Sequence, residues 1–261
     1  MRQRKFWSWL WLALAFTYFL MPLVATFLFS LRGKKGVLSF LAYRRVFDDP
    51  QFLSTFGFSL EMAILTVAAG FLLMVPTTIW IELKAPKLRP LIEALSYLPF
   101  VIPPIVLVFG LIRMYSRPPF ALVSTPALLV AGYIVISFPY MYRSISAGLQ
   151  VIHLKILMEA AQSLGASWTS AVLRIVLPNI RSALLSAALL TFAIVIGELT
   201  LAVMLAWPAF GPYMALVGRD RAYEPAALAI LSFLLTWLSV AVMHAVTRGG
   251  ERSDSGAGAV H

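Results

Sequence analysis

Few residues of this chain have the types and spacing that catalysis requires. Glu61, Glu93 and Glu198 are acids that fall within or next to long apolar runs. The sequence contains no recognisable Ser/His/Asp arrangement or catalytic pair of carboxylates, so it indicates neither nucleophilic catalysis nor glycoside hydrolysis. The three histidines are far apart and there is no cysteine. We therefore expect no metal site, no cofactor and no disulfide.

Nucleotide hydrolysis is not predicted for this chain either. A phosphate-binding loop would read G-x-x-x-x-G-K-[ST], with glycines that let the backbone N–H groups cradle the phosphates. The run Gly33-Lys34-Lys35-Gly36 lacks that spacing. We expect the chain to hydrolyse nothing itself.

Glu198 is the acid that lies deepest in an apolar run, AIVIGELTLAVML. An ionised acid at the centre of a bilayer costs roughly 2.5–3.5 kcal/mol, so such a residue normally faces a bundle interior or a wet cavity. Gly197 beside it allows another helix to approach closely, and Thr191 and Thr200 could donate hydrogen bonds. Two interpretations stay open: a structural hydrogen bond to a neighbouring helix, or a residue of a pathway or gate.

The elements that must position these residues belong to a membrane protein. Of 261 residues, 61% are hydrophobic and 12% are charged, whereas soluble domains carry about 25% charged residues. The net charge of +10 comes from Lys and Arg in short gaps between apolar runs. There they can meet lipid headgroups or partners, and we expect no nucleic acid partner.

Six apolar segments are each long enough to cross a bilayer as a helix, which takes roughly 17–25 residues. A helix also satisfies its own backbone in lipid, so the sequence predicts an all-α, polytopic protein with six transmembrane helices. The segments are Phe6–Ser30, Phe56–Ile81, Leu91–Met114, Pro126–Leu149, Ser182–Leu205 and Pro225–Val246.

The gaps between these segments suggest three parts. Residues 1–55 hold the first helix, retained rather than cleaved, and an external polar segment; residues 56–246 form the core with a long loop at 150–181; residues 247–261 form a disordered tail. With six spans both termini lie on one side. Placing them in the cytoplasm puts twelve of the Lys and Arg residues inside and nine outside, a weak bias of the usual sign.

Prolines interrupt the third segment. Pro99, Pro103 and Pro104 lie in SYLPFVIPPIVLVFG, and each removes a backbone donor and strains a helix. A plain packing kink is one interpretation. The other is a helix that flexes, or that lines the pathway during gating, because membrane proteins tolerate such breaks beside cavities.

The most informative stretch is Glu159-Ala160-Ala161, three residues, Gly165, nine residues, then Ile175-x-Leu177-Pro178. A short helix with an apolar stripe at Ile152, Ile156, Ala160 and Leu164 fits this sequence. Gly165 suits a left-handed position that ends the helix, Ser167 can cap a second helix, and Pro178 redirects the chain. The segment is predicted to be a helix–turn–helix outside the membrane; from the residues alone it could rest on headgroups as an interfacial amphipathic hairpin.

All seven specified positions resemble the EAA loop of ABC importer permeases. The resemblance implies a type I ABC importer permease fold in a prokaryotic inner membrane, with this loop in the cytoplasm. It also implies that the loop docks as a coupling helix on a separate ATPase. On this resemblance the ATPase-coupling residues are Glu159, Ala160, Ala161, Gly165, Ile175, Leu177 and Pro178.

The same resemblance implies a complex. It would contain two ATPase subunits, a second permease subunit that is a homologue or an identical copy, and an extracytoplasmic solute-binding protein. The G-E-L-T-L-A run is similar to permeases of the spermidine/putrescine class, which suggests a polyamine; iron(III), thiamine, phosphonate and sulfate stay open as solutes. A secondary transporter, which usually shows inverted repeats, or a membrane scaffold is the alternative class.

Overall fold

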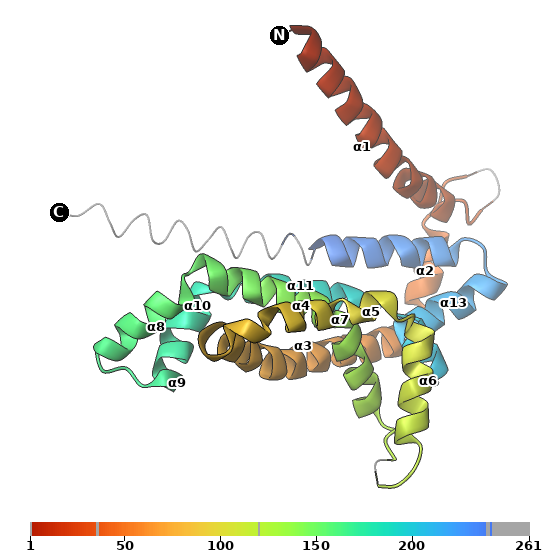
Figure 1. Ribbon diagram of the computed structural model, residues 1–261. Helices are drawn as coiled ribbons and strands as arrows, with labels where there is room; N and C mark the ends of the chain where they lie inside the picture. The colour runs from red at the N-terminus through yellow and green to blue at the C-terminus, as the bar shows by residue number, and fades with distance from the viewer. Residues whose placement is uncertain (1, 35–36, 120, 239–240, 242–261) are drawn as a thin grey trace.

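The computed structural model describes residues 2–34, 37–119, 121–238 and 241 (Figure 1). This part of the chain is mostly helical and contains no named strand, only the isolated bridges Arg32–Ser39 and Lys34–Val37. The labelled helices are α1 (Arg2–Ser30), α2 (Leu41–Phe47), α3 (Pro50–Lys84), α4 (Arg89–Ser96), α5 (Leu98–Val101), α6 (Pro104–Tyr115), α7 (Pro126–Val151), α8 (Leu154–Ser163), α9 (Trp168–Ala171), α10 (Leu177–Asn179), α11 (Arg181–Gly197), α12 (Thr200–Met204) and α13 (Phe210–Asp220). A 3-10 turn (Pro86–Leu88), a π-helical stretch (Val172–Val176) and a final helix (Glu224–Leu238) complete the set. The all-α prediction is confirmed.

Helices α3, α7 and α11 form the central bundle. Small residues let their backbones come close: a Cβ built on Gly70 of α3 would lie 2.6 Å from the side chain of Met141 on α7. On the other side of α7, a Cβ on Gly148 would lie 2.5 Å from Cβ of Ala183 on α11. Close packing of this kind drives helix association in membranes, where the hydrophobic effect between helices is absent.

The candidate membrane spans differ from the six continuous helices that were predicted. Among the described residues three helices are long and apolar enough, namely Trp9–Ser30, Pro50–Lys84 and Pro126–Val151. Two further spans qualify only as bent pairs of helices. The final helix, Glu224–Leu238, is apolar but shorter, and the rest of the predicted sixth segment lies outside the described residues. The structure therefore supports three to five spans directly.

The predicted third span is broken rather than kinked. Pro86–Val101 and Pro104–Tyr115 meet at an angle of 100°, with Ile102 extended at φ −87° and ψ 114° between them. The residue before a proline avoids the helical region, and Pro103 and Pro104 supply no N–H group for the ladder. The sequence prediction underestimated how strongly two adjacent prolines act.

The predicted fifth span also ends early. Helix α11 stops at Gly197 and Glu198 is extended, with φ −78° and ψ 128°. The short helices α12 and α13 follow, so Glu198 lies at a junction and not in the middle of a helix. The predicted tail, residues 247–261, lies outside the described residues.

Helix α1 stands apart from the bundle (Figure 1). None of its most apolar window is buried within the chain. Its C-terminal end is tied down by a hydrogen bond of 2.8 Å between the Ser30 and Tyr43 hydroxyls and by a ring contact between Phe29 and Tyr223. Its apolar surface is therefore available to lipid or to another chain.

Candidate functional site

The segment that carries the spaced motif folds as a helical hairpin at one end of the bundle, formed by α8, a tight turn and α9 (Figure 1). Gly165 has φ +85°. Its N–H donates to the carbonyl of Gln162 at 2.9 Å, and the N–H of Ala166 donates to the carbonyl of Ala161 at 3.0 Å. This pair of bonds is the Schellman arrangement. The predicted left-handed helix end at Gly165 is confirmed.

The second arm of the hairpin begins as predicted at Ser167. The Ser167 hydroxyl accepts a hydrogen bond of 3.2 Å from the N–H of Ser170, so it caps α9. The chain continues through the π-helical stretch into α10, which contains Leu177 and Pro178. It then bends by 72° into α11. The predicted redirection of the chain near Pro178 is thus present.

The buried face of α8 is not the apolar stripe that the four-residue spacing suggested. Leu154, Met158 and Ala161 are buried against the bundle. Ile156 and Leu164 point outward and are 68% and 90% exposed. The stripe is real, but it faces away from the chain because the other face of α8 already packs on the bundle.

The motif residues therefore divide into two sets. Ala161 is buried, and Ile175 and Leu177 pack partly against the same cluster, so these three hold the hairpin in place. The exposed set consists of Glu159, Ala160, Gly165 and Pro178. The Glu159 carboxylate lies 4.0 Å from the Lys155 ammonium group on the same helix face.

The exposed set is surrounded by apolar side chains. Leu164, Trp168 and Leu173 are all exposed on the two arms of the hairpin. Exposed apolar side chains that gather on one element mark a surface for a partner or for lipid. We call Ile156, Leu164, Trp168 and Leu173 the hairpin surface.

The proline break and Glu198, both singled out from the sequence, each come just before one of two helices, α6 and α12, that contact each other. Helix α6, which starts at Pro104, packs against α12, which starts just after Glu198. Both Glu198 oxygens accept hydrogen bonds from the first backbone N–H groups of α12, at 2.7 Å from Thr200 and 3.0 Å from Leu201. A carboxylate at a helix N-terminus accepts hydrogen bonds from the N–H groups that have no partner within the helix, and its negative charge interacts favourably with the positive end of the helix dipole. Glu198 thus caps α12, the helix that packs on α6.

Close packing also fixes the turn at Glu198. A Cβ on Gly211 of α13 would lie 2.6 Å from the carbonyl oxygen of Glu198, and a Cβ on Gly132 of α7 would lie 2.4 Å from the side chain of Leu201. Neither glycine was singled out in the sequence. Thr200, expected to offer its hydroxyl, contributes its backbone N–H.

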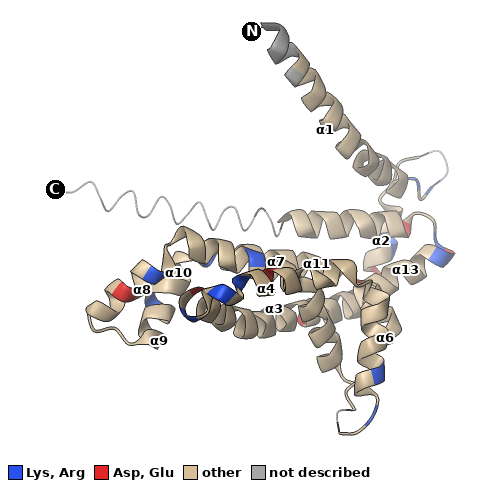
Figure 2. Ribbon diagram, in the orientation of Figure 1, with Lys and Arg blue, Asp and Glu red and all other residues tan. Residues whose placement is uncertain are grey.

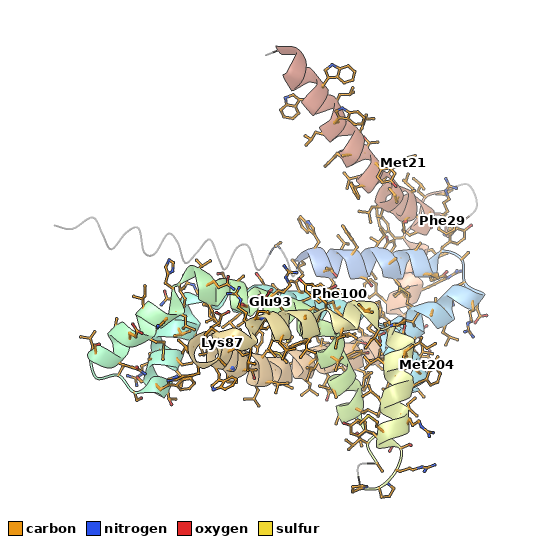
Figure 3. All side chains as sticks on the ribbon, viewed as in Figure 1. Met21, Phe29, Lys87, Glu93, Phe100 and Met204 are labelled. Atoms are coloured by element: carbon orange, nitrogen blue, oxygen red, sulfur yellow. The ribbon has the colours of Figure 1, made fainter. Side chains whose placement is uncertain are left out.

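A polar cavity of about 230 Å³ lies between α4 and α7, near the hairpin end of the bundle. Arg89 forms ion pairs with Glu93 at 3.0 Å and with Glu82 at 3.9 Å. Glu82 accepts a hydrogen bond from Ser146, which in turn accepts one from Gln150. Sequence reasoning noted Glu93 but missed its partners; the i, i+4 spacing of Arg89 and Glu93 was the available signal. Figure 3 labels Glu93 on this face.

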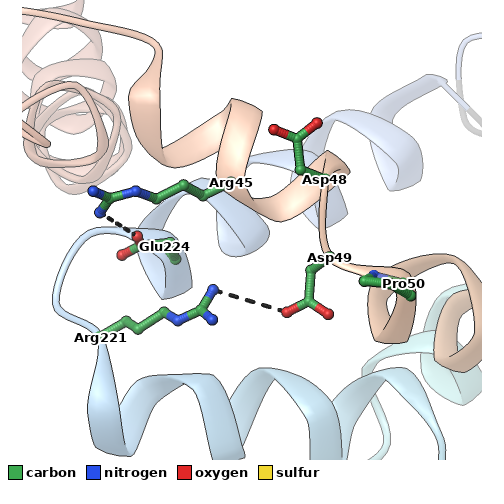
Figure 4. Close-up of a pocket in the computed structure, with 6 residues that line it drawn as sticks. All are labelled: Arg45, Asp48, Asp49, Pro50, Arg221 and Glu224. Atoms are coloured by element: carbon green, nitrogen blue, oxygen red, sulfur yellow. Dashed lines mark hydrogen bonds and ion pairs between the residues drawn. The ribbon is translucent and has the colours of Figure 1, made fainter.

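A second charged cavity, of about 570 Å³, lies at the opposite end of the bundle (Figure 4). Arg45 of α2 forms an ion pair of 3.1 Å with Glu224, whose side chain is 4% exposed. Arg221 lies 3.8 Å from Asp49, and Tyr213 donates a hydrogen bond of 3.1 Å to Asp49. Burial raises the pKa of Tyr213 to about 12, and the Asp49 carboxylate adds to the rise. Figure 2 shows charged residues at this end, near α2 and α13, as well as at the hairpin end.

Comparison of the sequence with known protein families shows to which family the chain belongs. Residues 74–248 match the family described as binding-protein-dependent transport system inner membrane component. The chain belongs to this family. The resemblance seen in the Glu159–Pro178 motif is confirmed, and the ABC importer permease class with it.

Known relatives of this inner membrane component carry different solutes in their names. The spermidine/putrescine transport system permease protein PotB of Escherichia coli is 27% identical over 179 residues, which cover 62% of this chain and 64% of PotB. A probable sulfate transport system permease protein of Prototheca wickerhamii is 30% identical over 171 residues, which cover 60% of this chain and 65% of that protein. The match thus spans less than two thirds of either relative.

The fold of the inner membrane component is shared with solved ABC transporters. One is the crystal structure of a bacterial alginate ABC transporter in complex with an alginate pentasaccharide-bound periplasmic protein. It matches with a TM-score of 0.71 at 18% identity, over 94% of this chain and 95% of that chain. At this identity the likeness shows a common fold.

Proposed function

We propose that this chain forms, with a second permease subunit, the translocation pathway of an ATP-driven importer. An extracytoplasmic binding protein delivers the solute, and two separate ATPase subunits hydrolyse ATP. The observation that carries the proposal is the hairpin surface, since the matched motif places exposed apolar side chains on a rigid hairpin that is anchored to the bundle. A hairpin seated in an ATPase cleft would transmit closure of the ATPases to α7 and α11, which flank it in the chain.

The direct test co-expresses the chain with its ATPase, its binding protein and a second permease subunit, and reconstitutes the complex in proteoliposomes. We expect solute uptake that requires ATP on the hairpin side and binding protein on the other side. Uptake driven by an ion gradient without ATP would instead assign a secondary transporter. A complex that assembles without any transport would assign a scaffold.

We further propose six spans, with the hairpin and both termini in the cytoplasm. The broken helix Pro86–Tyr115 and the segment from α11 to α12 each count as one span in this arrangement, and the final helix belongs to the sixth. The chain has no cysteine, so a single introduced cysteine is a clean topology marker. Gln162→Cys on the hairpin and Leu38→Cys before α2 are both exposed positions. Impermeant maleimide added to intact cells should label only Leu38→Cys; labelling of both would overturn this topology.

The pathway proposal assigns Glu198 a position next to the route of the solute. Support comes from its place at the α11–α12 junction, where α12 packs on α6 beyond the proline break. Glu198→Gln keeps the size of the side chain but removes the charge that caps α12. We expect the variant to assemble normally and to show altered uptake or altered basal ATPase activity. Wild-type values for both would assign Glu198 to structure alone.

The names of the relatives do not agree on the charge of the solute. PotB is named for polyamines, which are cations, and the Prototheca protein is named for sulfate, an anion. A small polar solute fits both. The choice between cation and anion therefore depends on the charges within this chain.

A further inference from the structure

The two grooves along the bundle have opposite chemistry. The groove between α3 and α11, with a volume of about 360 Å³, is lined entirely by apolar side chains such as Ile64, Val67 and Phe192. The cavity between α4 and α7 is lined mainly by charged and hydrogen-bonding side chains. Lipid tails suit the first groove. The second groove is suited to a watery pathway, because charges are costly against lipid.

The charges around the polar cavity come from two arginines and two glutamates, but they are not paired evenly. Arg89 is shared by Glu82 and Glu93, and Ser146 and Gln150 complete that network, so both acids already have a cationic partner. Arg143 is different. Its Nη1 donates to the Tyr97 hydroxyl at 2.8 Å and its guanidinium lies 5.7 Å from the centre of the Tyr97 ring.

No carboxylate of the described residues lies within ion-pairing distance of Arg143. Its guanidinium has five N–H donors in a planar fork that matches the geometry of carboxylate, sulfate and phosphate groups. One donor is used on Tyr97, which like Arg143 lines the cavity. Arg143 is thus the charged group of this cavity that has no carboxylate partner among the described residues.

We propose that the α4–α7 cavity is an anion-binding site in which Arg143, oriented by Tyr97, receives a carboxylate, sulfate or phosphate group of the transported solute. This inference rests on the proposed function, because it assigns the solute class of the same pathway. Its site residues are Arg143, Tyr97 and Arg89, with Glu82 and Glu93 holding Arg89 in place.

The test uses the full chain in phosphatidylcholine nanodiscs and the arginine reagent phenylglyoxal, with the rate of modification at each arginine read by mass spectrometry. The probes are inorganic phosphate, sulfate, succinate and spermidine. We expect at least one of the three anions to slow modification of Arg143 by about tenfold, while spermidine has no effect. Arg44 lies exposed on α2, at the opposite end of the bundle, and is the internal control. It should react at the same rate with every probe.

Variants identify the site that produces the protection. Tyr97→Phe keeps the ring and removes the hydroxyl, so Arg143 should still react but its protection by anions should weaken several-fold. Protection by none of the three anions, equal protection of Arg44, or protection by spermidine would overturn the proposal. Nanodiscs that contain phosphatidylglycerol supply the same chemistry from a lipid headgroup; protection there without soluble anion would assign the site to lipid and also overturn it.

The labelling result is independent of transport. If the reconstituted complex shows no ATP-dependent uptake, the proposed function fails while anion protection of Arg143 can still be present. If uptake is ATP-dependent but Arg143 is unprotected, only the anion site fails. In an active complex, Arg143→Gln should reduce uptake of the solute by about tenfold, and Arg143→Lys should retain part of it.

Discussion

The two ends of the bundle are finished in different ways. At the hairpin end, backbone hydrogen bonds and helix caps fix the shape, and apolar side chains such as Leu164 and Trp168 are left uncovered. At the opposite end, ion pairs join α2, α3, α13 and the final helix around a cavity, and the polar groups satisfy one another. The hairpin end therefore has a fixed backbone shape and an exposed apolar surface. The other end is held together by its own charges.

This difference indicates where a substitution should affect stability and where it should affect assembly. Residues that hold the chain together should change its unfolding when altered. Residues of the hairpin surface should leave unfolding unchanged and weaken binding to the ATPase. Four sets of variants test the comparison, in order of decreasing expected effect.

The largest effect is expected for the two faces of α8. Met158→Ala opens a cavity under the hairpin, because Met158 is buried, and should cost about 2–4 kcal/mol. Leu164→Ala, at a position that is almost fully exposed, should leave thermal unfolding in detergent unchanged while co-purification with the ATPase falls. The comparison breaks if Leu164→Ala destabilises the isolated chain or leaves ATPase binding intact.

The next effect concerns the ion pair at the other end. Arg45→Met leaves the buried Glu224 carboxylate without its partner, and should cost about 1–3 kcal/mol, since Arg45 itself is half exposed. Arg44→Met is the matched control, because Arg44 and Asp48 are both exposed, and should cost less than about 0.5 kcal/mol. Thermal unfolding of the three proteins measures both values. Equal losses would show that burial of Glu224 does not matter, and ATPase binding should be unaffected throughout.

A smaller effect is expected at Gly165. Space around a new Cβ is open, with nothing within 4 Å, so only the positive φ opposes substitution. Gly165→Val should cost about 1–2 kcal/mol and should uncouple ATP hydrolysis from uptake, because the hairpin turn changes shape. Gly165→Asn tolerates the left-handed conformation and should retain coupled uptake. Normal uptake and co-purification of the valine variant would contradict the coupling role.

The smallest effect is expected at the cap of α9. Ser167→Ala removes the acceptor for the Ser170 N–H and should cost about 1 kcal/mol. Ser163→Ala, two residues before Gly165, removes only a bond to the Glu159 carbonyl on its own helix and should be nearly neutral. Hydrogen exchange at the start of α9 distinguishes the two variants. Similar protection in both would mean that the ATPase-facing arm does not depend on its cap.

The hairpin was predictable from the sequence because its determinants are local. Gly165 and Ser167 act within four residues, and their conformations follow from residue type. The buried face of α8 was not predictable, since Leu154, Met158 and Ala161 form a stripe as apolar as Ile156 and Leu164. Which stripe is buried depends on the bundle that α8 meets, and that is non-local information.

The break points show the same limit. When hydropathy is averaged along the sequence, Leu91–Met114 and Ser182–Leu205 are predicted as continuous spans, because Pro103 and Glu198 hardly change the mean hydropathy. The backbone responds to single residues instead, and it bends at the proline pair and at Glu198. The pairs Arg45–Glu224 and Arg221–Asp49 join residues more than 170 positions apart, beyond any spacing rule.

The packing of α11 on α3 and α7 has a consequence for synthesis of the chain. Helices α3 and α7 can each enter the bilayer as they leave the ribosome, because a helix satisfies its own backbone in lipid. The third member of the bundle ends only at Gly197, so the close contact of Gly148 with Ala183 cannot form before most of the chain has been made. During that interval Arg143 lies on a helix whose neighbours are incomplete. We infer that the nascent chain depends on insertion machinery or chaperones until α11 arrives, since such intermediates expose the surfaces that later pack.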